Sequence, residues 1–190
     1  MSLTTKRAIS NSFSELLSKT TFDKITVRDI VENCGLNRQT FYYHFHDIYD
    51  LAEWTFDDHA QIFLEKHPFD GNWDNYIVLI LGQLKDKKHM IINAVDSMNR
   101  RWVENYLRTI LNPVITEVVR DMATGSTINE DNINFIIDLY DFMLSSLILE
   151  WVENGMSDYY TQRIDKYMII ARVSIADAIK SLEQEQNNKV

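Results

Sequence analysis

The segment that decides the fold is TVRDIVENCGLNRQTFYYHF, residues 26–45. Thr26 can cap a first short helix, and Asp29 three residues later gives a near match to a capping box. Gly35 supplies the positive φ that a sharp turn needs. Asn37 is a favourable N-cap for a second short helix. The pattern predicts a helix-turn-helix.

The apolar residues of this segment are spaced to pack on a third helix, predicted over residues 4–18. The residues that make these contacts are Ile30, Val31, Leu36, Phe41 and Phe45, with Phe13 and Leu17 receiving them. The second helix would then present polar and aromatic groups outward, namely Arg38, Gln39, Thr40, Tyr42, Tyr43 and His44. Such a helix fits the major groove of DNA, which is ~12 Å wide, with its N-terminal residues at the base edges.

The rest of the chain also reads as helix, because apolar residues recur at spacings of three and four and period-2 alternation is absent. We predict an all-α fold in two parts. Residues 1–46 form a three-helix helix-turn-helix domain, and residues 47–190 form a helical domain for dimerisation and effector or partner binding. Pro113 is expected to kink or split a helix over residues 101–122. One unbroken helix is expected over residues 158–185.

Composition narrows the class of protein. The longest apolar run, residues 76–81, has six residues, far short of the ~20 needed to cross a bilayer. No apolar segment follows the first basic pair, so no secretory signal is predicted. The single cysteine, Cys34, excludes a disulfide framework and is expected to be a small buried hydrophobe. These features predict a cytoplasmic protein that does not enter a membrane.

The charge of the chain is unevenly distributed. The net charge is −9. Residues 1–46 hold six basic and four acidic residues, a net charge of +2, whereas the remaining 144 residues hold 13 basic and 24 acidic residues, a net charge of −11. A mildly cationic head on an acidic body is compatible with a nucleic-acid partner, since counterion release depends on where the cations lie.

The helix-turn-helix segment resembles the DNA-binding domain of the TetR family of transcriptional regulators. Ten positions match the family pattern in register: Thr26, Val27, Ile30, Gly35, Leu36, Thr40, Phe41, Tyr42, His44 and Phe45. Leu51 also matches an apolar position in the helix that follows. The departures are Cys34 for alanine, Asn37 for serine and Ile48 for a lysine that often contacts phosphate. The last departure puts one backbone contact in doubt.

The resemblance implies roles for individual residues. Tyr42 and His44 are implied as phosphate ligands, and Thr26 as a phosphate contact at the start of its helix. The groove-facing set is Arg28, Arg38, Gln39 and Thr40. The full set expected at operator DNA is Thr26, Arg28, Asn37, Arg38, Gln39, Thr40, Tyr42, Tyr43 and His44. Lys6 and Arg7 could add contacts from the N-terminal arm.

The C-terminal part predicts dimerisation. A helix over residues 130–153 is apolar around much of its circumference, which requires burial on two sides. The last helix carries small residues that permit close helix approach. We expect a homodimer through the two C-terminal helices, which is how TetR-like proteins dimerise. The alternative is that the chain's own core covers both faces.

The resemblance also implies control by an effector in the body, whose identity the sequence does not give. Five aromatic residues either line a pocket or belong to the core: Trp73, Tyr76, Trp102, Tyr106 and Tyr140. The stretch FMLSSLILEWVENGMSDYY, residues 142–160, resembles a subgroup that includes regulators of dihydroxyacetone kinase operons. In that subgroup the regulator can be an activator, and a kinase-like partner protein can sense the metabolite.

Signatures of catalysis are missing from the sequence. It contains no H-E-x-x-H, G-x-S-x-G or G-x-G pattern. Residues 57–59, Asp-Asp-His, could be imagined as a metal site, but a polar helix face is the better interpretation. We therefore expect no enzyme activity, cofactor or metal. Two alternatives to a DNA-binding regulator remain: a helical adaptor that has lost DNA binding, and an all-helical enzyme.

Overall fold

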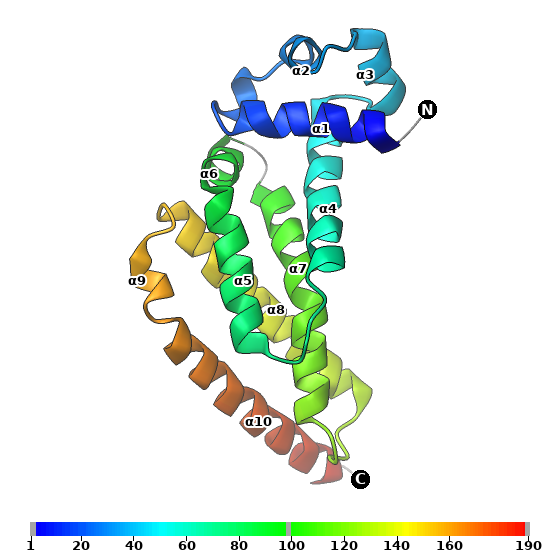
Figure 1. The fold of residues 1–190 in the computed structure, drawn as a ribbon. Coiled ribbons are helices and arrows are strands. Elements are labelled where there is room, and N and C mark those ends of the chain that lie inside the picture. Colours follow the sequence, from blue (N-terminus) through cyan, green and yellow to red (C-terminus); the bar gives the residue numbers. More distant parts are fainter. Residues whose placement is uncertain (1–2, 98–99, 189–190) are drawn as a thin grey trace.

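The computed structural model describes residues 3–97 and 100–188, and within them every regular element is a helix (Figure 1). The all-α prediction is therefore confirmed. Residues 1–2 of the first predicted domain, and residues 98–99 and 189–190 of the second, lie outside the described residues. The helices are α1 (Leu3–Leu17), η1 (Phe22–Lys24), α2 (Val27–Asn33), α3 (Arg38–His44), α4 (Ile48–Lys66), α5 (Trp73–Asp86), α6 (Lys88–Ser97), α7 (Arg100–Met122), α8 (Glu130–Glu153), α9 (Asp158–Thr161) and α10 (Ile164–Asn188).

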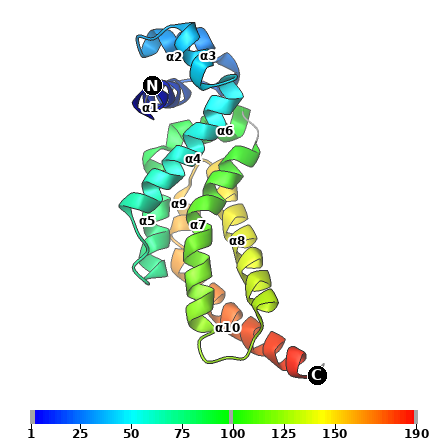
Figure 2. The ribbon, with the colours of Figure 1, turned by 90° about the vertical axis from the view of Figure 1, so that its right-hand side faces the viewer.

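The N-terminal helices α1, α2 and α3 form a small unit at one end of the molecule, which we call the head (Figures 1 and 2). Its core consists of fully buried apolar side chains from all three helices: Ile9, Phe13, Leu17, Ile30 and Phe41. One buried polar bond joins two of the helices, because Ser12 Oγ donates to the carbonyl of Ile30 at 2.8 Å. The predicted packing of the helix-turn-helix on α1 is confirmed.

Helix α4 runs from the head into the remaining helices, which we call the body (Figure 2). Helix α4 packs mainly on α7. The buried residues of α4 recur at helical spacing along one side: Leu51, Ala52, Thr55, Phe56, Ala60 and Phe63. The head and body are thus joined by one continuous helix whose inner face belongs to the core.

The centre of the body is the pair α7 and α8, which make the most extensive contact between any two helices described. The pair holds an ion pair at its interface. Arg108 Nε lies 2.8 Å from Asp141 Oδ2, and the Asp141 side chain is only 2% exposed. Burial raises the pKa of Asp141, and the bond from Arg108 opposes that rise. The long helix α10 lies along the outside of the pair (Figure 1).

The structure corrects the predicted helices of the body at two places. Pro113 does not split its helix: α7 is continuous from Arg100 to Met122. Pro113 is exposed while Val114 and Ile115 are buried, so the proline faces solvent and the helix is held by its buried side. The C-terminal stretch is not one helix either, because it breaks between Thr161 and Ile164 into α9 and α10.

None of the described helices is long and apolar enough to span a bilayer.

Candidate nucleic-acid interface

Helix α3 begins at a well-formed N-cap. Asn37 Oδ1 accepts a hydrogen bond from the backbone amide of Thr40 at 2.9 Å and from its hydroxyl at 3.1 Å. Phe41 is fully buried, and Phe45 is 2% exposed. The helix is therefore fixed to the head by its apolar side and by its cap, and both features were predicted from the sequence.

The opposite side of α3 is open to solvent. Arg38 and Gln39 are exposed, and Tyr42 and Tyr43 are 58% and 70% exposed. Within residues 3–97 and 100–188, Arg38 and Gln39 have no hydrogen-bonding or ion-pairing side-chain partner. Large aromatic side chains at such exposure on a rigid helix are available to a binding partner. In Figures 1 and 2 this helix lies on the side of the head away from the body.

The two candidate residues at the start of α2 already have local partners. The Thr26 hydroxyl accepts from the Asp29 amide, and the Thr26 amide donates to Asp29 Oδ2 at 2.9 Å, which completes the predicted capping box. The Thr26 hydroxyl also donates to Asp29 Oδ2 at 2.6 Å. These bonds lower the pKa of Asp29. Arg28 Nε pairs with Glu32 Oε1 at 2.6 Å, one turn along the helix. Both residues are exposed, so they lie at the surface, but part of their bonding capacity is used within α2.

His44 is half-buried at the end of α3, with its ring 5.1 Å from that of Tyr43. Its Nε2 atom is buried and has no hydrogen-bond partner in the described part of the chain. A phosphate contact through this nitrogen requires a movement of the ring, whereas Nδ1 is the other possible donor. Cys34 is half-buried and packs against the core, and its thiol donates weakly to the carbonyl of Val31 at 3.7 Å.

The first two cations of the chain do not point outward. Arg7 Nη2 lies 2.9 Å from Asp58 Oδ1 of α4, and Arg7 Nε bonds the same carboxylate. The Asp58 side chain is only 11% exposed. The Nζ atom of Lys6 lies 5.0 Å from the ring centroid of Phe45 and 5.2 Å from that of Trp54. In this structure Lys6 and Arg7 join α1 to α4 rather than extend an arm, and sequence spacing gave no sign of it.

The departure at Ile48 has a structural consequence. Ile48 is partly buried and packs on the core, so no cation stands at the start of α4. The cap there is Asp47, whose Oδ1 accepts from the amides of Tyr49 at 2.8 Å and Asp50 at 2.9 Å. The turn between α3 and α4 is thus fixed by backbone bonds, and any phosphate contact at this turn must come from other donors.

The head is also joined to the body through η1 and α6. The rings of Phe22, Tyr49 and Trp102 form a cluster with centroid distances of 5.1 to 5.9 Å. Asn93 Nδ2 of α6 donates to the carbonyl of Leu17 at 2.8 Å, and so satisfies a carbonyl at the end of α1. Sequence reasoning missed this contact, since it joins residues far apart in the chain.

The five aromatic residues considered for a pocket do not meet in one place. Trp102 lies at the contact between head and body, and Tyr106 packs on Phe56 at 5.9 Å. Burial raises the pKa of Tyr106 to about 12. Trp73 and Tyr140 border two different hollows. These residues do not form one pocket. Four of them are buried and Trp102 is partly buried against the core, so the alternative interpretation, that they belong to the core, is confirmed.

The Asp-Asp-His segment of α4 is not a cluster of ligands. Asp58 is bound to Arg7, and His59 is half-buried, with no partner for its buried Nδ1 among the residues described. Burial, with a smaller contribution from Lys87, lowers the pKa of His59 to about 4. The described residues contain no group of three or more histidine, cysteine or acidic side chains that could hold a metal ion.

Comparison with protein families gives two matches along the chain. The model of the bacterial regulatory proteins of the tetR family matches residues 14–53, and a model of a transcriptional regulator C-terminal region matches residues 71–172. Among curated proteins, the chain is 30% identical over 88 residues to the HTH-type dhaKLM operon transcriptional activator DhaS of Lactococcus lactis subsp. lactis (strain IL1403). The match spans 46% of this chain and 46% of that relative, so it covers less than half of either protein.

Two solved structures are similar over most of the chain. A dihydroxyacetone kinase operon activator, DhaS, superposes with a TM-score of 0.70 over 92% of this chain and 97% of that chain, at 19% sequence identity. A TetR transcriptional regulator from Streptococcus agalactiae 2603V gives a TM-score of 0.55 over 85% of this chain and 93% of that chain, at 23% identity. At these identities the two structures show the fold alone, and that fold is the predicted one.

Proposed function

The chain belongs to the TetR family of bacterial regulatory proteins, and we propose that it is a homodimeric, sequence-specific DNA-binding regulator of transcription. The observation that carries this proposal is the exposed side of α3, where Arg38, Gln39, Tyr42 and Tyr43 stand free on a helix fixed by a buried phenylalanine and a cap. The packing of α3 on the head uses none of these four exposed side chains, so they are available to a binding partner.

We assign the contacts by position along α3. Arg38 and Gln39 lie in its first turn, where a recognition helix meets base edges, and each can bind a base with two hydrogen bonds. Tyr42 and Tyr43 lie in its second turn, where hydroxyl groups reach phosphates. Asn37 and Thr40 hold the start of the helix and can donate to the DNA backbone.

The other residues expected at the DNA flank the α3 side chains assigned above. Thr26 and Arg28 stand at the start of α2 beside α3, and His44 at the end of α3 reaches phosphate through one of its ring nitrogens. Residues 1–46 form the DNA-binding part in this proposal, and residues 47–190 form the part for dimerisation and for an effector or partner.

The proposed dimer surface lies on α8 and α10. Seven large apolar side chains there are between 42% and 64% exposed: Phe135, Leu139, Phe142, Met143, Ile169, Ile170 and Val173. A largely apolar groove of about 510 Å³ between the two helices is bordered by Phe142, Met143 and Ile170. Apolar exposure on this scale marks an interface, and family membership supports a second copy of the chain as the occupant.

A dimer presents two copies of α3, which must lie about 34–36 Å apart to enter successive major grooves. The helix α4 joins each head to its body, so a change in its tilt changes that spacing. Control by an effector or a partner protein would then be a shift between populations that fit DNA and populations that do not. The relatives that carry the description of dihydroxyacetone kinase operon activator support an activator of such an operon, with a kinase-like coactivator.

The proposal is tested by DNA binding of three variants to a mixed-sequence pool and to a selected operator. Tyr42→Phe should weaken binding to all sequences alike, by about fivefold for each half-site, because a net hydrogen bond is worth roughly 1 kcal/mol and each protomer loses one. Arg38→Ala should chiefly relax preference at one base position. Lys66→Ala removes an exposed charge from the end of α4 that is remote from the head, and serves as the control. If the first two variants behaved like the control, the assignment would be wrong.

The second candidate is a helical adaptor that has lost DNA binding, which the absence of a cation at Ile48 favours. A salt titration separates the two. For a regulator that engages several phosphates, log K for DNA binding falls linearly with log[salt], with a slope of about −0.9 for each phosphate neutralised. An adaptor shows no salt-dependent binding to duplex DNA. The family and its neighbours point to a regulator rather than to an enzyme.

A further inference from the structure

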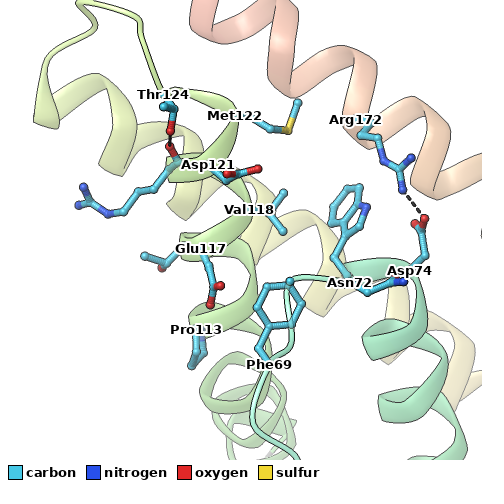
Figure 3. A pocket seen from close by; sticks show the side chains of 14 residues that line it. Phe69, Asn72, Asp74, Pro113, Glu117, Val118, Asp121, Met122, Thr124 and Arg172 are labelled. Atoms are coloured by element: carbon cyan, nitrogen blue, oxygen red, sulfur yellow. Dashed lines mark hydrogen bonds and ion pairs between the residues drawn. The ribbon is translucent and has the colours of Figure 1, made fainter.

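Polar side chains join neighbouring helices in both parts of the molecule. In the body, Arg172 of α10 bonds Asp74 of α5 at a broad hollow, and both side chains are about half exposed (Figure 3). That pair ties the outer helix α10 to α5. In the head, hydrogen bonds among four side chains tie α1 to α2, and we call this set the α1–α2 network: Ser12, Glu15, Lys19 and Asn33.

The α1–α2 network runs from the surface of the head to a buried carbonyl. Asn33 Nδ2 donates to Ser12 Oγ at 3.0 Å and to Glu15 Oε2 at 3.2 Å. Ser12 Oγ donates to the carbonyl of Ile30 at 2.8 Å. Lys19 Nζ bonds the other carboxylate oxygen of Glu15 at 2.5 Å. The two bonded residues on each helix lie one turn apart, so a full turn of α1 is matched to the last turn of α2.

Asn33 supplies the amide that both acceptors on α1 use. Its NH₂ group has two hydrogens, which suffice for Ser12 and Glu15 together. Because Ser12 Oγ accepts from Asn33, the hydrogen of the serine is left for the carbonyl of Ile30. Bonds from Lys19 and from Asn33 lower the pKa of Glu15, so the acceptor there is a carboxylate at neutral pH. Removal of the amide therefore leaves Ser12 and Glu15 without their donor from the last turn of α2.

The last turn of α2 leads directly into α3. Gly35 and Leu36 donate their backbone amides to carbonyls of α2 at 3.3 and 2.8 Å, which is the pattern of a Schellman motif. Gly35 has the positive φ of +68° that this motif needs. Only four residues, 34–37, separate Asn33 from the first residue of α3. The direction of α3 therefore follows the position of the last turn of α2.

Apolar packing holds the middle of α2 more firmly than its end. The buried residues of α2 are the neighbours Ile30 and Val31, whereas Val27 and Cys34 are only partly buried. Two adjacent side chains act close to one point, so they fix the place of a short helix better than its direction. Asn33 lies at the end nearer to α3, where a bond to α1 controls the direction of α2 most strongly.

We propose that Asn33 is a positioning residue for DNA recognition, whose amide holds the last turn of α2 against α1 and so sets the direction in which α3 presents Arg38 and Gln39. This inference rests on the proposed function, since it concerns how α3 reads DNA. Asn33 acts through α3 and not by touching DNA. Loss of its amide therefore reduces discrimination between an operator and other sequences, but leaves the phosphate contacts that give non-specific binding.

The test compares Asn33→Leu, which keeps the size of the side chain and removes the amide, with the matched control Asn11→Leu. Asn11 is an exposed residue of α1 outside the network. Asn33→Leu should lower the affinity for a selected operator at least tenfold, because a lost base contact costs roughly fivefold or more in each of two heads. Affinity for random duplex DNA should change by less than twofold, and Asn11→Leu should change neither affinity by more than that. A general loss of folded protein would lower both affinities alike.

The double variant S12A/E15A removes both acceptors on α1 and shows whether Asn33 acts through them. In this background Asn33→Leu should change the operator affinity by less than twofold, because residues that share hydrogen bonds are coupled. The same cost as in the parent would show that Asn33 acts elsewhere, and would overturn the proposal.

Cys34 gives a measurement that needs no DNA, because it is the single cysteine of the chain, follows Asn33 and is half-buried. Asn33→Leu should raise the rate at which iodoacetamide alkylates this thiol several-fold, and Asn11→Leu should leave the rate unchanged. An unchanged rate in Asn33→Leu, or an equal loss of operator and random-DNA affinity, would contradict the proposal. If the parent prefers no sequence at all, the proposed function fails, and the alkylation rate alone decides whether Asn33 holds the turn.

Discussion

The exposed side of α3 and the exposed sides of α8 and α10 differ in what they leave to solvent. In α3 the free groups are polar or amphipathic, on a helix of seven residues fixed by its cap and by Phe41. In α8 and α10 the free groups are aliphatic and aromatic, on helices of 24 and 25 residues. A short helix with polar groups suits a polar groove that is read by hydrogen bonds, whereas long helices with apolar faces suit burial against another protein chain. The difference teaches that the two ends of the molecule are built for different partners.

The largest effect is expected from a charge on the apolar surface of the body. Phe142→Asp should convert a dimer to monomers, because a carboxylate cannot be buried there without a partner. A monomer holds one half-site instead of two, so operator affinity should fall at least a hundredfold. Sedimentation equilibrium and DNA titration measure the two effects. Val78→Asp places the same charge on α5, where Val78 is 56% exposed, and should change neither.

The second prediction concerns α4, which joins the two regions. In the folded chain the pKa of His59 is lowered from 6.5 to about 4, so folding favours its neutral form. Above pH 6.5, His59 is neutral in both the folded and the unfolded chain, and the folded chain keeps its full stability. As the pH falls from 6.5 toward 4, the folded chain loses stability, because only the unfolded chain takes up the proton on His59. Between pH 7 and pH 5 the free energy of unfolding should fall by about 2 kcal/mol on this account.

Urea unfolding of the parent and of His59→Gln at both pH values isolates this contribution, because other groups titrate equally in both proteins. The loss of stability between pH 7 and pH 5 should be smaller in the variant by that amount. Equal losses in the two proteins would show that His59 is protonated in the folded chain.

A third prediction asks whether Arg7 belongs to the head's DNA surface or to its attachment. Since Arg7 is bound to Asp58, Arg7→Ala should weaken DNA binding several-fold by loosening α1 from α4, without changing the salt dependence. A direct phosphate contact would instead reduce the slope of log K against log[salt] by about one for each half-site bound. DNA titrations of parent and variant at several salt concentrations decide between the two roles.

The smallest effect is expected at the start of α2. Thr26→Ala removes the N-cap that accepts from the Asp29 amide and should cost about 1 kcal/mol of stability. Thr26→Ser should restore the stability because the cap needs only a hydroxyl. Thermal unfolding measures this role. If both variants bind DNA as the parent does, Thr26 serves the cap alone; if Thr26→Ala loses affinity beyond its loss of stability, the phosphate contact is supported.

The head was more predictable than the body, for a physical reason. Its caps at Thr26 and Asn37 and its turn at Gly35 are local, so the sequence displays them within a few positions. The orientation of Lys6 and Arg7 was missed because it depends on where Trp54 and Asp58 lie after folding. The same holds for Asn93, whose partner is a backbone carbonyl with no sequence signal.

In the body, local signals were misleading. Pro113 suggested a break, but burial on the other side of α7 kept the helix continuous. The break between α9 and α10 was missed, because neither a glycine nor a proline marks it. The large apolar content of α8 predicted burial on two sides, and one of those sides is exposed in the single chain.

The most direct measurement is selection of genomic DNA fragments by the purified protein, for the parent and for Arg38→Ala. The account predicts an enriched sequence with two-fold symmetric half-sites whose centres lie about one helical turn, roughly 10 bp, or a whole number of turns apart. It also predicts relaxed preference at one symmetric pair of positions in the variant. Enrichment of no sequence, or of the same sequence with the same preferences by both proteins, would contradict the claim that α3 reads DNA.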